Sequence, residues 1–359
     1  VAAAAPGQVG GVFTVPCQQI GGKGERVLHG DIDFFIFFKA NSSGLLYHHQ
    51  AYHYTRRRDI IEEPLMLDFF KRIFGSEPEP SGPIVLDAPI ASTGAMDSLY
   101  SVELEPGKHI PSVYVEARSD PRQVLKHFRF PVEPQAAIFI TGGASRMSEE
   151  DKRLTRELFE QSIAPFAQSH NITVIDGATK SGVIEMMATA RLKGKYTFPL
   201  VGIVPHKRVT YAGKVGHMDD THELCPGHSH FVFVTGDDYG AESEMIVNMA
   251  HVLAGGERDK AGRELAAIGI VVNGGSITRQ EAFMATSKYI DIPLIVMEGS
   301  GRFADELASA VRTGETSQAL IRSIIDRGNV QLAATTGGPD EMTRKLEVAY
   351  QTDKDQFAR

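Results

Sequence analysis

The feature that most constrains this fold is a series of short apolar segments, each followed by a polar or glycine-rich turn. The pattern is clearest at residues 268–302, IGIVVNGGSITRQEAFMATSKYIDIPLIVMEGSGR. Its β-branched start predicts a strand buried on both faces, and the glycine pair after it predicts a sharp turn into a helix. Pro293 opens a second strand, which ends at another glycine turn. Turns of this kind direct free N–H groups and the positive end of a helix at one place, where phosphates bind.

Earlier segments of the chain repeat this pattern, at residues 136–140, 172–175, 200–204 and 231–234. Alternating strands and helices predict parallel strands joined by right-handed crossovers, so the turns are expected at one edge of the sheet. In open α/β sheets, ligands bind at the carboxyl ends of the strands. We therefore expect residues 135–359 to form a Rossmann-like open parallel sheet with helices on both faces, carrying a nucleotide pocket at that edge.

Residues 1–134 show a different pattern and predict a separate β-rich domain of unnamed fold. The first residues, 1–11, are expected to be disordered, and residues 131–134 are expected to form a linker. A chain of 359 residues commonly divides into two domains. The expected strands are residues 34–38, 45–54, 84–86, 99–104 and 112–117, with a helix at residues 64–74.

Composition argues against several classes of protein. The net charge of −8 disfavours a nucleic-acid partner, and no apolar segment approaches the roughly 18 residues that a membrane span needs. Two cysteines, Cys17 and Cys225, cannot form a disulfide framework, which favours a reducing, cytoplasmic location. A homo-oligomer is left open.

Histidines are concentrated in a polar loop at residues 206–230, between the strands expected at residues 200–204 and 231–234. Cys225, His228 and His230 are close enough in sequence to bind zinc together, with His217 and His222 upstream, but the spacing fits no standard site. We therefore expect neither a metal nor a cofactor, only a nucleotide bound as ligand, with the imidazoles at the pocket mouth.

Charged residues also follow the strands. A cluster of cations in an acidic protein predicts a site for a small anion; its members are Arg146, Lys180, Lys207, Arg208, Arg279 and Arg302. Acids at strand ends could instead bind ribose hydroxyls; these are Asp176, Asp237, Asp238 and Glu298. The G-x-G-x-x-G motif is absent, so a conventional NAD dehydrogenase is not expected.

Three blocks resemble the cytoplasmic N-terminal region of melastatin-type TRP channels, which contains a SLOG-type Rossmann-like domain. They are HSHFVFVTGDDYGAESE (228–244), VVNGGSITRQEAF (271–283) and VMEGSGRFADELA (296–308). The turns ITGGAS (140–145) and DGATKSGVI (176–184) fit the same pattern. The resemblance implies a soluble, prokaryotic-style nucleotide sensor with an ADP-ribose-like or ribose-phosphate ligand.

The same superfamily includes LOG-type phosphoribohydrolases, whose signature is P-G-G-x-G-T-x-x-E. Gly274, Gly275, Thr278 and Glu281 match it, whereas residues 273 and 277 depart from it. In those enzymes the glutamate acts on the ribose with an arginine from the preceding helix, and residues 242–253 contain no arginine. N-ribosyl hydrolysis by Glu281 therefore stays an alternative. A scaffold without a ligand, with a partner-binding N-terminal half, is a third hypothesis.

The predicted site combines glycines, where a ligand can come close to the backbone, with hydroxyl donors, imidazoles and charged groups. Its ligand-binding residues are Gly142, Gly143, Ala144, Ser145, Arg146, Gly177, Thr179, Lys180, Gly182, His228, His230, Gly274, Gly275, Ser276, Thr278, Glu298, Gly299, Ser300, Gly301 and Arg302.

Overall fold

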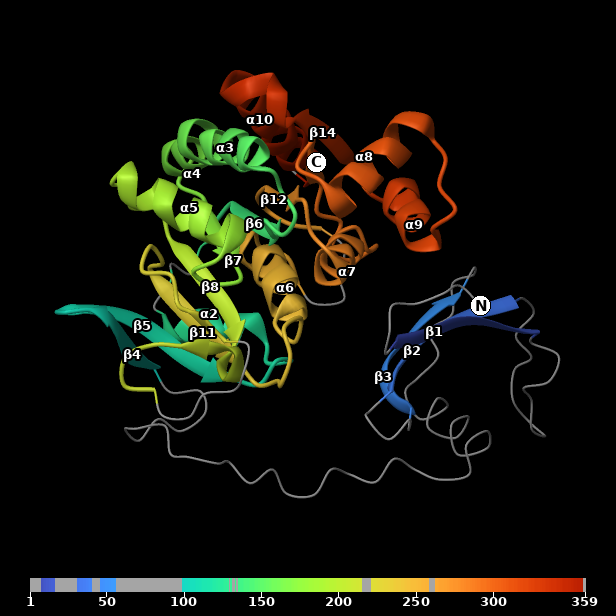
Figure 1. Cartoon of the computed structure of the whole chain (residues 1–359), viewed down its shortest axis with the longest axis horizontal. Coiled ribbons are helices and arrows are strands. Elements are labelled where there is room, and N and C mark those ends of the chain that lie inside the picture. The colour runs from blue at the N-terminus through green and yellow to red at the C-terminus, as the bar shows by residue number, and fades with distance from the viewer. Residues whose placement is uncertain are drawn as a thin grey trace. The chain divides into compact units, whose positions relative to one another are not determined.

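The computed structural model describes residues 8–16, 31–40, 46–55, 99–128, 130, 133, 135–214, 221–257 and 262–357. Contacts divide the chain into two compact units, Val1–Val85 and Leu86–Arg359 (Figure 1). None of the helices in the described ranges combines the length and the apolarity that a membrane span requires.

The first unit contains an antiparallel sheet of three strands in the order β1-β2-β3. The strands are β1 (Gln8–Pro16), β2 (Asp31–Ala40) and β3 (Leu46–Thr55). Two of the expected strands are thereby confirmed. Residues 8–11, expected to be disordered, instead pair with β2, from Gln8 opposite Lys39 to Gly11 opposite Ile36. The strand expected at 84–86 and the helix expected at 64–74 lie outside the described residues.

The second unit is built on a nine-stranded sheet in the order β14-β13-β12-β6-β7-β8-β11-β5-β4. Every neighbouring pair is parallel except β4 and β5, which confirms the open, mainly parallel α/β sheet. The strands are β4 (Leu99–Glu105), β5 (Lys108–Val115), β6 (Ala137–Gly142), β7 (Thr173–Asp176), β8 (Leu200–Pro205), β11 (His230–Val234), β12 (Ala267–Val272), β13 (Leu294–Glu298) and β14 (Val330–Ala334). A small parallel pair, β9 (Val209–Thr210) and β10 (His222–Glu223), lies outside this sheet.

Helices cover both faces of the sheet, because side chains alternate between the faces along each strand. In β6, Ala137 and Phe139 join the core under one helix layer, and Ile138 and Ile140 join the core under the other (Figure 1). The first layer contains α2 (Pro121–His127), α6 (Ser243–Leu253), α7 (Ser276–Ala285), α8 (Arg302–Thr313) and α9 (Ala319–Arg327). The second contains α3 (Glu149–Leu158), the π-helical turn η2 (Phe159–Ile163), α4 (Ala164–Ser169), α5 (Gly182–Lys193) and α10 (Gly338–Phe357).

The division into units differs from the boundary expected at residue 134. The hairpin β4–β5 belongs to the second unit, because β5 pairs in parallel with β11 from Ser112 opposite Phe231 to Val115 opposite Val234. The strand segments themselves were predicted correctly. Their assignment to a separate domain was wrong, because a sequence pattern shows that a strand exists but not which partner it pairs with.

The chain order creates a switch point in the sheet between β6 and β12. From β6 the chain proceeds through β7, β8 and β11 on one side, and then returns to β12, β13 and β14 on the other. The connections therefore diverge where β6 and β12 end, which opens a crevice at their carboxyl ends.

Candidate functional site

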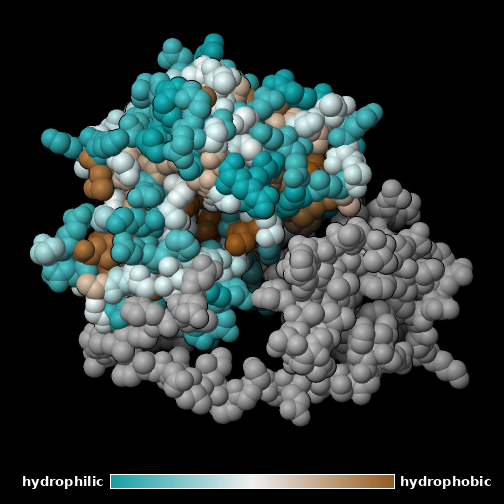
Figure 2. Space-filling model, viewed as in Figure 1, coloured by the Kyte–Doolittle hydropathy of each residue, from teal (hydrophilic) through white to brown (hydrophobic). Residues whose placement is uncertain are grey.

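A cavity of about 390 Å³ lies at this switch point. Figure 2 shows a hollow bordered by apolar residues beside α6, within a surface that is mostly hydrophilic. The cavity is lined by Ile140, Thr141, Gly142, Gly143, Gly177, Thr179, Ser181, Ile184, His222, Tyr239, Glu242, Ile246, Gly274, Gly275, Ser276, Ile277, Thr278, Glu281 and Arg302. Many of the predicted residues are therefore brought together at the expected edge of the sheet.

The turn between β12 and α7 forms one wall of the cavity. Gly274 adopts a φ of +87°, and a Cβ there would lie 2.5 Å from the side chain of Thr278. Gly275 is the N-cap of α7, no side chain caps this helix end, and the first backbone bond of the helix joins Arg279 N–H to Gly275 O. The earlier N–H groups of a helix have no partner within it, so the positive end of α7 is available to an anion.

Arg302 supplies a cation beside this helix end. It begins α8 with a φ of +48°, its side chain is exposed, and it lines the cavity. A Cβ on Gly275 would lie 2.7 Å from the guanidinium Nη2, so the guanidinium packs directly on the Gly275 backbone. Among the described residues, this guanidinium has no hydrogen-bond or ion-pair partner.

The other predicted cations do not line the cavity, and most are paired with acids. Lys180 pairs with Glu223 at 2.9 Å. Lys207 Nζ lies 2.7 Å from Asp237, and Arg208 Nη2 lies 2.6 Å from Asp238. Arg279 pairs with Glu306 and also donates to Gln318. Arg146 is exposed and has a φ of +65°. Of the predicted cations, Arg302 is therefore the one that the described cavity lining contains.

Two buried carboxyl groups lie in the cavity wall. Thr141 Oγ1 donates to Glu281 Oε2, and Ser243 Oγ donates to Glu281 Oε1 at 2.8 Å. Burial raises the pKa of Glu281 to about 6, although both hydroxyl donors oppose this shift. Gly240 N–H donates to Glu242 Oε2 at 2.7 Å. Burial, reinforced by the charge of Glu281, raises the pKa of Glu242 to about 8.

The remaining wall is apolar and aromatic. Tyr239 Oη donates to the carbonyl of Arg208 at 2.9 Å, so the 2.6 Å contact between His222 Nδ1 and Tyr239 Oη has the imidazole as donor. The apolar part consists of Ile140, Ile184, Ile246 and Ile277. The expectation that an imidazole lies at the pocket is met by His222. His217 lies outside the described residues.

His228 and His230 do not line the cavity, contrary to prediction. His228 is fully buried, with Nε2 2.7 Å from Asp176 Oδ1 and Nδ1 2.9 Å from the Cys225 carbonyl. His230 lies at the amino end of β11, away from the ligand edge, and its ring centroid is 5.0 Å from that of Phe128. Burial there lowers its pKa to about 4. The sequence pattern shows that both residues lie near a strand, but it does not show at which end of the strand they lie.

Other predicted residues shape the turns rather than line the cavity. Asn273 has a φ of +52°, and its N–H donates to Ser300 Oγ at 2.7 Å. Its Nδ2 donates to the Ser145 carbonyl at 2.9 Å. These bonds join the turns after β6, β12 and β13. Glu298 is directed to Arg312, with contacts of 2.6 and 2.5 Å. Also outside the lining are Ala144, Gly182, Gly299 and Gly301.

Sequence reasoning missed Glu242, Ser243, Tyr239 and Thr141. Their signal was their position: Thr141 is the last residue but one of β6, and the others lie in the turn and first helical residues that follow β11. Each therefore lies at or after the end of a strand that ends at the ligand edge. In the described part of the chain, no group of three His, Cys, Asp or Glu residues is arranged to hold a metal ion.

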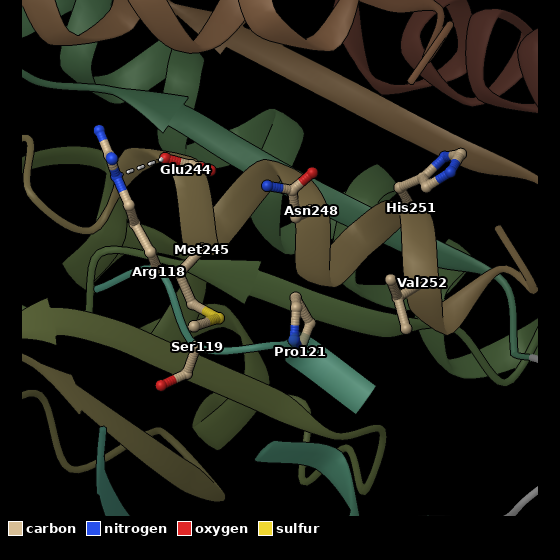
Figure 3. A pocket seen from close by; sticks show the side chains of 8 residues that line it. All are labelled: Arg118, Ser119, Pro121, Glu244, Met245, Asn248, His251 and Val252. Carbon is tan, nitrogen blue, oxygen red and sulfur yellow. Dashed lines mark ion pairs between the residues drawn. The ribbon is translucent and has the colours of Figure 1, made fainter. Parts of the chain in front are cut away.

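A second hollow lies between the loop before α2 and the outer side of α6 (Figure 3). Its volume is about 10 Å³, which is room for roughly one water molecule. The side chain of Arg118 extends toward Glu244, with Nε 3.7 Å from Oε2 (Figure 3). This hollow is too small to be a ligand site.

The sheet, its switch-point cavity and the helix N terminus beside a cation define a Rossmann-like α/β domain. The chain belongs to the family described as "SLOG in TRPM, prokaryote", which matches residues 135–340. It is also similar to a transient receptor potential channel of Caenorhabditis elegans, with 26% identity over 283 residues. That similarity covers 69% of this chain but only 13% of the channel. These findings confirm the family resemblance seen in the sequence.

Proposed function

We propose that this chain binds a nucleotide, with a phosphate group at the N terminus of α7 and beside Arg302. The observation that carries the proposal is an exposed guanidinium without a partner among the described residues, next to a helix end that no side chain caps. A helix N terminus attracts anions, and a guanidinium can bind a phosphate through two hydrogen bonds.

The shape and the chemistry of the cavity support a ligand of nucleotide size. Its volume of about 390 Å³ falls within the ~300–1,000 Å³ range of small-molecule pockets. The isoleucines offer an apolar surface for a base, and the hydroxyls of Ser276, Thr278 and Thr179 can contact phosphate or ribose oxygens. ADP-ribose and related ribose phosphates combine these parts, and we propose them as the ligand class.

N-ribosyl hydrolysis is the second candidate function. Glu281 favours it, because a buried carboxyl group with a pKa of about 6 is suited to general acid catalysis near neutral pH. Helix α6, however, reads SEMIVNMAHVL and supplies no arginine to accompany this carboxyl. We therefore propose binding without turnover as the main function.

A thermal-shift series separates the two functions. The full chain is heated with ADP-ribose, AMP, NAD or cyclic ADP-ribose, and each mixture is then assayed for released base. A ligand at a hundredfold excess over its Kd stabilises the folded state by about 2.7 kcal/mol. A shift with intact ligand supports a binding protein, and released base supports the hydrolase. If no nucleotide produces a shift, the proposal is wrong.

Replacing Arg302 tests the phosphate contact. We expect Arg302→Gln to weaken ADP-ribose binding about ten- to hundredfold, because a hydrogen bond to a charged group contributes about 1.5–3 kcal/mol. Arg279→Gln is the control, since Arg279 pairs with Glu306 on the same side of the molecule without lining the cavity. Titration calorimetry gives both affinities. Equal affinities in the two variants would contradict the assignment.

A further inference from the structure

Glu242 places in the cavity wall a carboxyl group that no side-chain donor of the described residues contacts. Its side chain lines the cavity, yet the residue is only 6% exposed. Oε2 accepts the N–H of Gly240 at 2.7 Å. The residue's own backbone N–H also donates to the carboxyl group, so among the described residues both of its donors are backbone N–H groups. A buried carboxyl group that lines a cavity and has no side-chain partner indicates a contact completed by a ligand.

Glu281, the neighbouring acid, is held by side chains instead. Both oxygens of Glu281 accept hydroxyl groups, from Thr141 and from Ser243. Glu281 is therefore held as an acceptor by the protein itself. Glu242 is the N-cap of the adjacent helix α6, and backbone N–H groups rather than side chains hold its carboxyl group beside the ligand space, so the two carboxyl groups have different roles.

Few other charged groups face Glu242. Helix α6 packs against α2, α7, β6, β7 and β12. On these elements, Arg279 pairs with Glu306 and Asp176 pairs with His228. Arg122 donates a hydrogen bond to the Gly256 carbonyl. Exposed Lys126 bonds to Gln123. The titratable or charged groups that line the cavity together with Glu242 are His222, Tyr239, Glu281 and Arg302.

We propose that Glu242 is a neutral acid in this cavity at neutral pH, and that it donates its O–H to an acceptor oxygen of the phosphorylated ligand. The inference rests on the nucleotide-binding function proposed above. An ionised Glu242 would place a second, largely buried negative charge beside Glu281 and opposite an anion. The neutral form removes that repulsion and supplies a donor. Glu242 thereby selects ligands that offer an acceptor oxygen.

The consequence is that binding takes up a proton at alkaline pH. With a pKa of about 8, Glu242 is mostly protonated at pH 7 and mostly ionised at pH 9. Binding at pH 9 must therefore bring one proton from the buffer onto this carboxyl group. Lys214 also titrates near pH 8, but its ammonium donates to the carbonyls of His206 and Val209, outside the cavity lining.

Calorimetry in two buffers with different ionisation enthalpies measures this uptake. ADP-ribose is the probe, because its diphosphate lacks the phosphate monoester group that titrates near pH 6. For the wild type we expect binding to take up nearly one proton per ligand at pH 9 and only a small fraction of a proton at pH 7. The affinity should fall about tenfold for each pH unit above pH 8.

Two variants make the test specific. Glu242→Gln keeps a donor without a titratable proton, so it should bind with similar affinity at pH 7 and 9 and take up no proton. Glu244→Gln removes an acid two positions along the chain that is directed to Arg118 (Figure 3), and should behave as the wild type. Wild-type binding without proton uptake, or unchanged uptake in Glu242→Gln, would overturn the inference.

Infrared spectroscopy of the unliganded chain separates this inference from the proposed function. A carboxylic C=O band present at pH 7 and lost at pH 9, in the wild type and in Glu244→Gln but not in Glu242→Gln, supports a neutral Glu242 even if no nucleotide binds. If the wild type lacks this band, the inference is wrong, whatever the ligand series shows.

Discussion

Gly142 and Gly143 are neighbours in the sequence, but they serve different purposes. Gly142 has a φ of +152°, and a Cβ there would lie 2.0 Å from the carbonyl oxygen of Val272 on β12. At Gly143 a Cβ would meet nothing within 4 Å. The first glycine allows two strands to approach at the switch point, whereas the second leaves the cavity open.

This difference predicts opposite outcomes for two similar variants. Gly142→Ala should lower the free energy of unfolding by about 3 kcal/mol, because the clash is with backbone and cannot be relieved by a rotamer change. Gly143→Ala should leave stability nearly unchanged, since its Cβ has open space. Urea denaturation measures both. Similar losses in the two variants would show that the Val272 contact is not what requires a glycine.

The candidate site could be predicted from the sequence to the extent that its chemistry is local. The glycine turns and Arg302 follow their strands directly, so their position at the ligand edge follows from strand direction alone. Glu242 was missed because its burial beside Glu281 depends on the packing of α6 on α7. His230 was misplaced because a histidine next to a strand can lie at either edge of a sheet.

At the scale of elements, the short strand β7 depends on a buried ion pair. β7 ends at Asp176, whose Oδ1 accepts the N–H of Ala178 at 2.9 Å and lies 2.7 Å from His228 Nε2. Burial alone would lower the pKa of His228, but Asp176 and the side chain of Cys225 raise it above its ordinary value. The pair therefore joins the end of β7 to the loop that precedes β11.

Removing the imidazole should destabilise the fold in a pH-dependent way. His228→Leu leaves Asp176 buried and unpaired, which costs about 3–5 kcal/mol. Because the folded-state pKa is raised, the stability that His228 contributes through protonation is fully present below the unfolded pKa of about 6.5 and is lost as pH rises through the folded value. The stability difference from the wild type should thus be largest near pH 6.

Denaturation curves at pH 6 and pH 9 check this expectation, with His109→Leu as an exposed control on β5. A difference between wild type and His228→Leu that stays constant over this range would mean that the pair does not titrate with folding.

At the scale of the whole molecule, the sheet extends beyond the matched family region. The match begins at residue 135, whereas β4 and β5 precede it and complete one side of the sheet. The parallel core could be predicted, because each strand and helix carries its own periodicity. The attachment of the hairpin could not, because it depends on pairing between residues 112–115 and 231–234, far apart in the chain.

Truncation tests this architecture. A fragment of residues 86–359 should remain dispersed, because its sheet keeps the hairpin. A fragment of residues 135–359 should aggregate, since it exposes the edge of β11 with Phe231 and Phe233, and bare strand edges pair with other chains. Size-exclusion chromatography with light scattering compares both with the full chain. A monodisperse 135–359 fragment would show that β11 does not need its partner.

The backbone at Asn273 excludes proline, which fixes φ near −65°. Asn273 has a φ of +52°; its N–H donates to Ser300 Oγ and its Nδ2 donates to the Ser145 carbonyl. Proline at this position would lose both bonds, because it has neither an N–H nor a side-chain amide. A single exchange would therefore disconnect the three turns that follow β6, β12 and β13.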